Sequence, residues 1–351
     1  MSRLEKSGEV SYTNPVLIVK VREKLVEFLS SIPETVDYEA SVELDVANVG
    51  RVSSTWMPRR IAVVDGGSNI VSLNAGYLGI VASLGIVVED NCVVDRVVGE
   101  PEIVPSSPSE LRYYETSEQI TSIIDKVREA KVFEVALKLL EEEPDLLIID
   151  GPLIPYGALG KIVVGSRSEE EALRRYRESV LALHRRALER ASSVIGFVKR
   201  PRSRYLSKIM NTEVSFDHVL LSRILGEGEY FPDPPFEVPA ASEWFHDVGI
   251  LGLIEKIKPR FTFLRLSGPT PPYRIDFGHV VHDYRGILGY LYATRTREGI
   301  PYVIMKADEE VKITRKLMKE LYEDALHNCV MKYLRHDFSK LIPILPEYGG
   351  I

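Results

Sequence analysis

Ile61-Ala-Val-Val-Asp65-Gly-Gly and Leu146-Leu-Ile-Ile-Asp150-Gly-Pro are the two stretches that decide the fold of this chain. In each, a short and very apolar run ends in an aspartate, and glycine follows at once. Such a run is typical of a buried strand, and the glycine favours a sharp turn after the acid. Two such strand ends side by side would concentrate negative charge, which is costly unless a cation is bound. The pair therefore predicts a divalent metal site.

Hydrophobic periodicity orders the chain around these stretches. Three strand-like runs precede a long helix that contains no proline or glycine and stops at Pro144. The expected elements are strands at 60–65, 71–83 and 85–88 with 93–98, a helix at 117–143 and a strand at 146–150. This β-β-β-α-β order predicts an α/β fold.

Helices are also expected on both sides of this unit, at 15–32 and from Pro301 to residue 333. We therefore divide the chain into three parts. They are an N-terminal helical extension at 1–58, a core with insertions at 59–315 and a C-terminal helical segment at 316–351.

Composition narrows the classes of function. The chain has 351 residues, 45% of them hydrophobic, so it can bury a large core. Its formal net charge of −7 excludes a uniformly basic nucleic-acid coat, so any such contact has to come from local patches. Cys92 and Cys329 lack metal-ligand spacing, which argues against zinc and favours a reducing cytoplasm. We expect no secretory leader in the charged segment 1–10 and no membrane-spanning run.

A third acid lies on the long helix. The apolar stripe of this helix consists of Ile120, Ile123, Val127, Ala130 and Leu137. Glu134 falls on the stripe, whereas Glu129 lies off it. A glutamate on a packing face is expensive unless it has a partner. If the helix packs beside the Asp150 strand, Glu134 is expected to reach the same cleft. The bland alternatives are a salt-bridged glutamate and two solvated Asp-Gly turns.

An acid on the first strand, a glutamate on the helix and an aspartate on the fourth strand resemble the ribonuclease H-like fold. Within that fold the chain resembles the NurA nuclease family of archaea and some bacteria, from Arg60 to Ile313. The residues that carry the resemblance are Ile61–Ser68, Arg128 with Glu134 and Ala136, Leu146–Leu153, Val198–Arg200 with Ser203 and Leu206, Gly299–Pro301, Ala307–Asp308 and Lys312–Ile313. The resemblance implies a mixed sheet flanked by helices, with helical extensions at both ends.

The late segment departs from the family pattern. The family usually has Gly-Tyr-Pro followed by Ala-His, and here Ile300 and Asp308 stand at the tyrosine and histidine positions. Asp308 still offers an oxygen ligand, because a fourth acid has that role in related ribonuclease H-like nucleases.

The resemblance implies a metal-dependent DNA nuclease, of the single-strand endonuclease or 5′–3′ exonuclease type, that acts in DNA end resection and recombination repair. Oxygen ligands suit Mn²⁺ or Mg²⁺, and two such ions activate water and stabilise a leaving oxygen. We assign Asp65 to both ions, Asp150 and Glu134 to one each, and Asp308 to completing the shell. The resemblance further implies a homodimer, DNA single strands and ends as substrate, and a HerA-type hexameric ATPase as partner.

A basic patch follows the expected strand that ends at Val198. Its residues are Lys199, Arg200, Arg202, Arg204, Tyr205 and Lys208. These cations are expected to track a DNA backbone near the metal cleft, with Tyr205 stacking on a base. The alternative interpretation is a solvated run of charge.

Two other functions stay open. An actin-like or sugar-kinase ATP-binding protein has a similar core, and Asp65-Gly-Gly-Ser68 resembles its first phosphate loop. However, Asp150-Gly-Pro152 is a poor second loop. The second alternative is a non-catalytic, NurA-like dimeric partner of a HerA-type motor, which the residues at Ile300 and Asp308 motivate.

Overall fold

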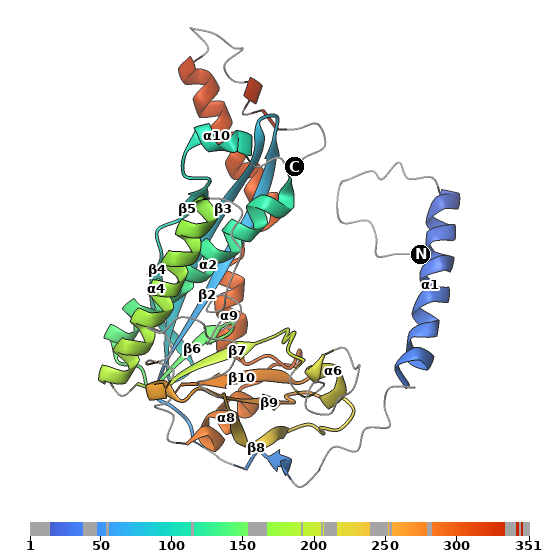
Figure 1. Ribbon diagram of the computed structural model, residues 1–351, viewed down its shortest axis with the longest axis vertical. Helices are drawn as coiled ribbons and strands as arrows, with labels where there is room; N and C mark the ends of the chain where they lie inside the picture. Colours follow the sequence, from blue (N-terminus) through green and yellow to red (C-terminus); the bar gives the residue numbers. More distant parts are fainter. Residues whose placement is uncertain are drawn as a thin grey trace.

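The computed structural model describes residues 15–37, 48–53, 56–113, 116–153, 167–190, 192–204, 206, 216–238, 252, 255–278, 283–333, 342–343 and 345–346. Within these ranges, ten strands form a single mixed sheet (Figure 1). Its order is β1 (Gly50–Arg51), β8 (Glu229–Glu237), β9 (Arg260–Leu264), β10 (Tyr273–Phe277), β7 (Val194–Val198), β6 (Leu146–Asp150), β2 (Arg60–Leu73), β3 (Gly76–Glu89) and β4 (Cys92–Val98), with β5 (Glu102–Val104) on β3.

The β-β-β-α-β order predicted from the sequence is confirmed. β2, β3 and β4 form an antiparallel unit, helix α2 (Ser117–Leu139) crosses over, and β6 returns parallel to β2. β7 then adds parallel to β6, while β10 pairs antiparallel with β7. The parallel centre of the sheet therefore consists of β2, β6 and β7.

We had expected a turn after Asp65. Instead, β2 continues to Leu73 and pairs along its whole length with β3. The glycines serve close packing instead of a turn. A Cβ built on Gly66 would lie 2.7 Å from Val132 of α2. A Cβ on Gly67 would lie 2.2 Å from the carbonyl oxygen of Val311. Bare backbone is thus required where two layers press on the strand.

Alternation along the central strands builds two cores. Ala62, Val64 and Leu147 pack with helices α2 and α4 (Arg167–Arg190) on one face. Ile61 and Val63 pack with helices α8 (Tyr284–Ala293) and α9 (Tyr302–Val311) on the other. Every second side chain of a strand points to the same face. The two helical layers therefore pack against alternate residues of the same strands.

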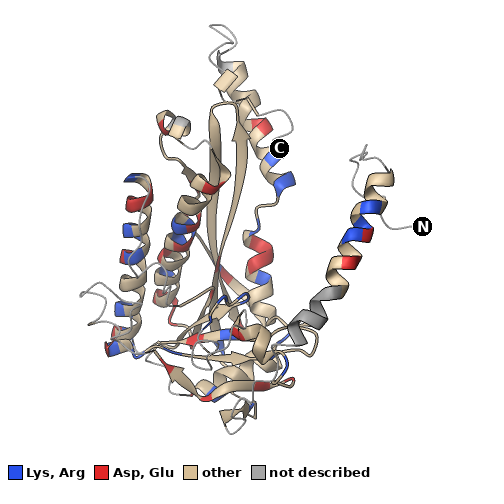
Figure 2. Ribbon diagram, turned by 45° about the vertical axis from the view of Figure 1, so that its right-hand side comes forward, with Lys and Arg blue, Asp and Glu red and all other residues tan. Residues whose placement is uncertain are grey.

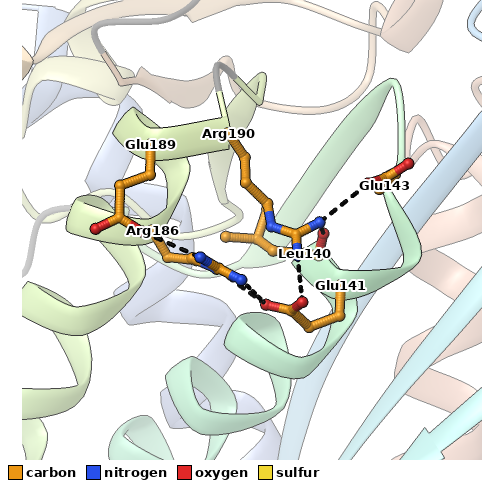
Figure 3. A network of polar contacts seen from close by, with 6 residues as sticks. All are labelled: Leu140, Glu141, Glu143, Arg186, Glu189 and Arg190. Carbon is orange, nitrogen blue, oxygen red and sulfur yellow. Dashed lines mark hydrogen bonds and ion pairs between the residues drawn. The ribbon is translucent and has the colours of Figure 1, made fainter.

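The turn between α2 and β6 is held by arginines from the last turns of α4 (Figure 3). Arg186 binds Glu141 at 2.9 Å, and Arg190 binds Glu141 and, at 3.2 Å, Glu143. The helix that we expected to reach Glu143 ends at Leu139, and a 3₁₀ turn (η3, Leu140–Glu142) follows. Ion pairs this exposed are each worth about 1 kcal/mol or less. Figure 2 shows acidic and basic positions interspersed along the helices.

The helices near the two ends of the chain differ in their relation to the sheet. α10 (Arg315–Tyr333) lies along the far half of the β2–β3 hairpin, where Met318 packs with Val71. The first helix, α1 (Pro15–Asp37), stands apart from the sheet in Figures 1 and 2. Its apolar side chains are exposed, with Phe28 at 65%. The short helices η2 (Pro108–Tyr113) and α6 (Asp217–Leu221) complete the described elements.

Candidate metal centre

Asp65 and Asp150 lie side by side, Asp150 at the carboxyl end of β6 and Asp65 within β2, at the level where its pairing with β6 ends. The register pairs Val64 of β2 with Ile149 of β6, so the two aspartates follow in the same row. Each stands two residues after a side chain of the α9 face, which directs both carboxylates toward that face. Both are largely buried: Asp65 is 9% exposed, and the side chain of Asp150 is 8% exposed.

Asp308 brings the third carboxylate from helix α9. The helix packs on the sheet through Ile304 and Ala307, which leaves the following residue at the strand ends. Within the described part of the chain, one group of acids gathers tightly enough to hold a metal: Asp65, Asp150 and Asp308. One oxygen from each lies within 4.8 Å of the others. The side chain of Asp308 is 48% exposed, so the pocket opens on its side.

Lys199 lies inside this acidic cluster. It follows β7 on the same face, and its Nζ is 2.5 Å from Oδ2 of Asp150 and 3.2 Å from Oδ1 of Asp308. We had expected Lys199 to track a DNA backbone near the metal cleft, and in the structure it is the counter-ion of two aspartates. Three carboxylates and one ammonium still leave an excess of acid in the cluster.

Burial dominates the electrostatics of the cluster. It raises the pKa of Asp65, and the nearby charge of Asp150 raises it further. Burial also raises the pKa of Asp150, although Lys199 opposes this shift. Burial alone would lower the pKa of Lys199, but the charges of Asp150 and Asp308 raise it overall. Two carboxyl groups that resist ionisation beside one another are typical of a site that an added cation completes.

Glu134 does not join the cluster, which corrects our expectation. Helix α2 covers the face opposite to the one that Asp65 and Asp150 point to. The carboxylate of Glu134 instead accepts two hydrogen bonds from Arg175 of α4, at 2.7 and 2.9 Å. The argument that a glutamate on a packing face needs a partner holds, but its partner is a guanidinium.

Glu129 of α2 lies next to the end of β6, on the face opposite to the acidic cluster. A Cβ built on Gly151, the residue after Asp150, would lie 3.9 Å from Oε2 of Glu129. Arg128 donates to Oε1 of Glu129 at 3.0 Å, and burial raises the pKa of Glu129. The side chain of Arg128 also lies over Gly66, where a Cβ would meet its Cγ at 2.8 Å. Arg128 and Glu129 thus lie beside the glycines that follow the two strand aspartates.

The rise per residue of β6 and of α2 shows that Glu129 is the acid of α2 at the level of Asp150. Four steps of β6, from Leu146 to Asp150, climb about 13 Å at about 3.3 Å per residue. Helix α2 runs in the opposite direction and rises about 1.5 Å per residue. The position about nine residues before Leu139 is therefore level with Asp150. Glu129 is at that height, whereas Glu134 lies about 7 Å lower.

The expected basic patch is described in part. Arg200, Arg202 and Arg204 are exposed in the segment that leaves β7 after Lys199. The guanidinium carbon of Arg204 lies 5.2 Å from the ring centroid of Phe216, a cation–π distance. Tyr205 and Lys208 lie outside the described residues.

The sheet and the three carboxylates together define an α/β protein of the ribonuclease H-like class, with a candidate metal pocket at its strand ends. The chain belongs to the NurA family, because the model of the NurA domain matches residues 59–313. This confirms the resemblance seen in the sequence and decides against the actin-like alternative. No curated protein matches the chain.

Solved structures of NurA proteins share the fold. The NurA nuclease from Sulfolobus solfataricus has a TM-score of 0.63 and 15% identity, over 89% of this chain and 97% of its own. A NurA structure with manganese has a TM-score of 0.56 and 14% identity, over 89% and 98%. One bound to dAMP and manganese has a TM-score of 0.52 and 12% identity, over 89% and 96%. The predicted mixed sheet flanked by helices is thereby confirmed. Among the described helices, none has the length and apolarity to cross a bilayer.

Proposed function

We propose that this protein is a metal-dependent nuclease that hydrolyses DNA phosphodiesters by a two-metal mechanism. The observation that carries the proposal is the gathering of Asp65, Asp150 and Asp308 within 4.8 Å. Membership in the NurA family supports the same activity. Carboxylate oxygens are the ligands that Mg²⁺ and Mn²⁺ prefer, and the acid excess of the cluster fits a divalent ion.

The residues divide the work by position. Asp65 would contribute a ligand to both ions, because β2 contacts both β6, which carries Asp150, and α9, which carries Asp308. Asp150 and Asp308 would each hold one of the ions. A bound Mn²⁺ or Mg²⁺ supplies activation of water and stabilisation of charge on the leaving oxygen.

Lys199 has two tasks in this proposal. It offsets the charge of Asp150 and Asp308 in the metal-free protein, because its Nζ lies within 3.2 Å of both. With the two aspartates bound to a metal, its ammonium would be available to a phosphate oxygen of the substrate. Arg200, Arg202 and Arg204 follow it as exposed cations in the segment that leaves β7, which suits a strand of DNA.

The biological setting rests on the family alone. We propose DNA single strands and ends as substrate, a role in end processing during recombination repair, a homodimer and a HerA-type ATPase partner in the cytoplasm. One NurA structure contains dAMP and manganese, which supports a DNA substrate. The exposed apolar side chains of α1 support a contact with a further protein chain. Light scattering of the purified chain, alone and with the ATPase, would measure both assemblies.

Substitution of the two strand acids tests the activity. We expect Asp65→Asn and Asp150→Asn each to lower cleavage of a labelled single strand in Mn²⁺ by at least about a thousandfold, because each removes a ligand charge from the metal pocket. DNA binding measured in EDTA should be unchanged. Asp233→Asn is the matched control, since Asp233 is a half-buried acid that binds Tyr230 and Tyr284 away from the pocket. Cleavage by the two site variants at the wild-type rate would refute the nuclease.

A non-catalytic partner of a motor is the second candidate. The ion pairs of Lys199 favour it, because the lysine already offsets part of the acid charge without metal. It predicts that the wild-type protein binds DNA but releases no labelled product with either metal.

A further inference from the structure

A buried ion pair in β10 lies outside the acidic cluster. Arg274 and Asp276 are 8% and 2% exposed. Nε of Arg274 donates to Oδ1 of Asp276 at 2.7 Å, and Nη2 donates to Oδ2 at 3.0 Å. Removing two charges from water costs several kcal/mol per ion, and apolar residues often replace such pairs without loss. A local salt bridge therefore does not by itself explain why this strand buries an aspartate.

Asp276 has a further bond that leads to the metal pocket. The backbone N–H of Leu153 donates to its Oδ2 at 3.2 Å. Leu153 is fully buried and stands three residues after Asp150, in the loop that leaves β6. The carboxylate of β10 therefore reaches past β7 to the chain that carries the predicted ligand.

Gly196 makes this reach possible. Across the sheet, Asp276 of β10 pairs with Gly196 of β7, and Gly196 pairs with Ile149 of β6. These three residues share one face of the sheet. A Cβ built on Gly196 would lie 2.4 Å from the nitrogen of Leu153 and 2.7 Å from the oxygen of Gly151. The loop after Asp150 thus folds back onto bare backbone, within reach of Asp276.

His184 holds the same residue from the opposite side. This buried side chain of α4 has its Nε2 3.2 Å from the carbonyl oxygen of Leu153. A carbonyl oxygen can only accept, so Nε2 carries the proton in this bond. The N–H of Gly151 also donates to the oxygen of Phe197, at 3.0 Å. Side chains from β10 and α4 therefore fix both polar groups of Leu153, and β7 fixes the start of the loop.

We infer that Asp276 and His184 are positioning residues, which clamp the Gly151–Leu153 loop and so aim the Asp150 carboxylate at Asp65 and Asp308. The inference rests on the proposed metal centre. A ligand carboxylate has to be held to within about 0.5 Å by its supporting residues. The N–H of Gly151 and both backbone polar groups of Leu153 are bound by other elements, which restricts the rotation of the strand end.

Metal affinity in the full-length protein tests the inference. Mn²⁺ binding is measured by calorimetry for the wild type, Asp276→Asn and the control Asp233→Asn. We expect Asp276→Asn to weaken Mn²⁺ binding by at least about tenfold, the usual effect of losing a group that orients a metal ligand. Asp233→Asn loses hydrogen bonds to Tyr230 and Tyr284 but touches no part of the loop, so its affinity should equal that of the wild type.

A second pair of variants separates positioning from stability. His184→Gln keeps a donor for the carbonyl of Leu153, whereas His184→Leu removes it. We expect Mn²⁺ affinity to fall in His184→Leu and to recover at least in part in His184→Gln, with thermal unfolding showing that both are folded. Wild-type affinity in folded Asp276→Asn and His184→Leu would overturn the inference and leave the nuclease standing. A wild-type protein that binds no Mn²⁺ would overturn the proposed function, and the inference with it.

Discussion

Two charged clusters flank the sheet of this protein, and they differ in balance. Beside α2 and α4, Glu102 and Glu134 face two cations, because Arg175 binds both acids at 2.7 Å and Lys131 binds Glu102 at 3.1 Å. On the α9 face, three aspartates share the single ammonium of Lys199. The first cluster is neutral, and the second carries an excess of acid.

The pKa shifts follow this difference. Burial alone would raise the pKa of Glu102, but hydrogen bonds from Arg175 and Lys131 lower it overall. The pKa values of Asp65 and Asp150 are raised by burial instead. A balanced cluster is complete without a ligand, whereas an acid-rich one in a buried place calls for an external cation. This contrast is what separates a structural glutamate from a candidate metal ligand here.

The largest expected effect is the pH dependence of metal binding. Carboxyl ligands have to lose their protons, so the affinity for Mn²⁺ rises with pH through the window between about pH 6 and about pH 8, where Asp150 and Asp65 titrate. Below that window the affinity falls by up to about a hundredfold per pH unit, if two protons are displaced. Calorimetry at several pH values measures it. A flat profile from pH 5 to pH 8 would show that these groups do not hold the ion.

The metal-free protein should respond to pH with the opposite sign. A carboxyl whose folded pKa is raised binds its proton more tightly in the native state, so stability falls as pH rises above the ordinary carboxyl range and levels off beyond about pH 8. Thermal unfolding in EDTA follows this decline. The decline should be smaller in Asp65→Asn, which has no proton to lose.

Removing the internal cation sharpens the comparison further. Lys199→Met leaves three aspartates without an ammonium, so we expect Mn²⁺ to bind about tenfold more tightly, which corresponds to about 1.4 kcal/mol. The variant should also be less stable in EDTA than the wild type. Arg200→Met is the matched control, because Arg200 is an exposed neighbour outside the acidic cluster. A weaker affinity in Lys199→Met would mean that the lysine helps to hold the ion.

The smallest effect is expected in the balanced cluster. Glu134→Gln keeps the shape of the side chain but removes the charge that pairs with Arg175. The side chains of Glu134 and Arg175 are each about one third exposed. We expect a loss of about 1 kcal/mol or less in the free energy of unfolding and no change in Mn²⁺ affinity. Glu129→Gln, about one and a half turns earlier on α2 and beside Gly151, is the companion variant. Denaturant unfolding and calorimetry of both variants show whether either glutamate affects the metal pocket.

Sequence reasoning found the strands that matter, for a physical reason. Asp65 and Asp150 end apolar runs, and a parallel strand that is buried on both faces consists almost entirely of apolar residues. Their adjacency followed from the β-β-β-α-β order, because a helix that crosses over returns a strand beside the first one. Asp308 lies more than 150 residues after Asp150, and the family resemblance supplied it where no local pattern did.

The failures share a cause as well. The stripe on α2 describes one helix by itself, whereas the partner of Glu134 comes from α4. Two glycines in a row indicate a turn, yet at Gly66 and Gly67 they admit neighbouring layers to an unbroken strand. The counter-ion role of Lys199 and the bond from Leu153 to Asp276 depend on strand order, which no local pattern contains. Local chemistry was predictable, and assembly across strands was not.

Because Gly66 and Gly67 have no side chains, the layer between α2 and the end of α9 is only one main chain thick immediately beyond Asp65. Helix α2 rests on that main chain from one side and the end of α9 from the other, so the strand acts as a spacer whose width is set by covalent geometry. Even the methyl group of an alanine at either glycine would push a helix away from the strand. We therefore expect saturation mutagenesis to show that substitutions are poorly tolerated at these two positions, whereas neighbouring positions accept side chains of other shapes.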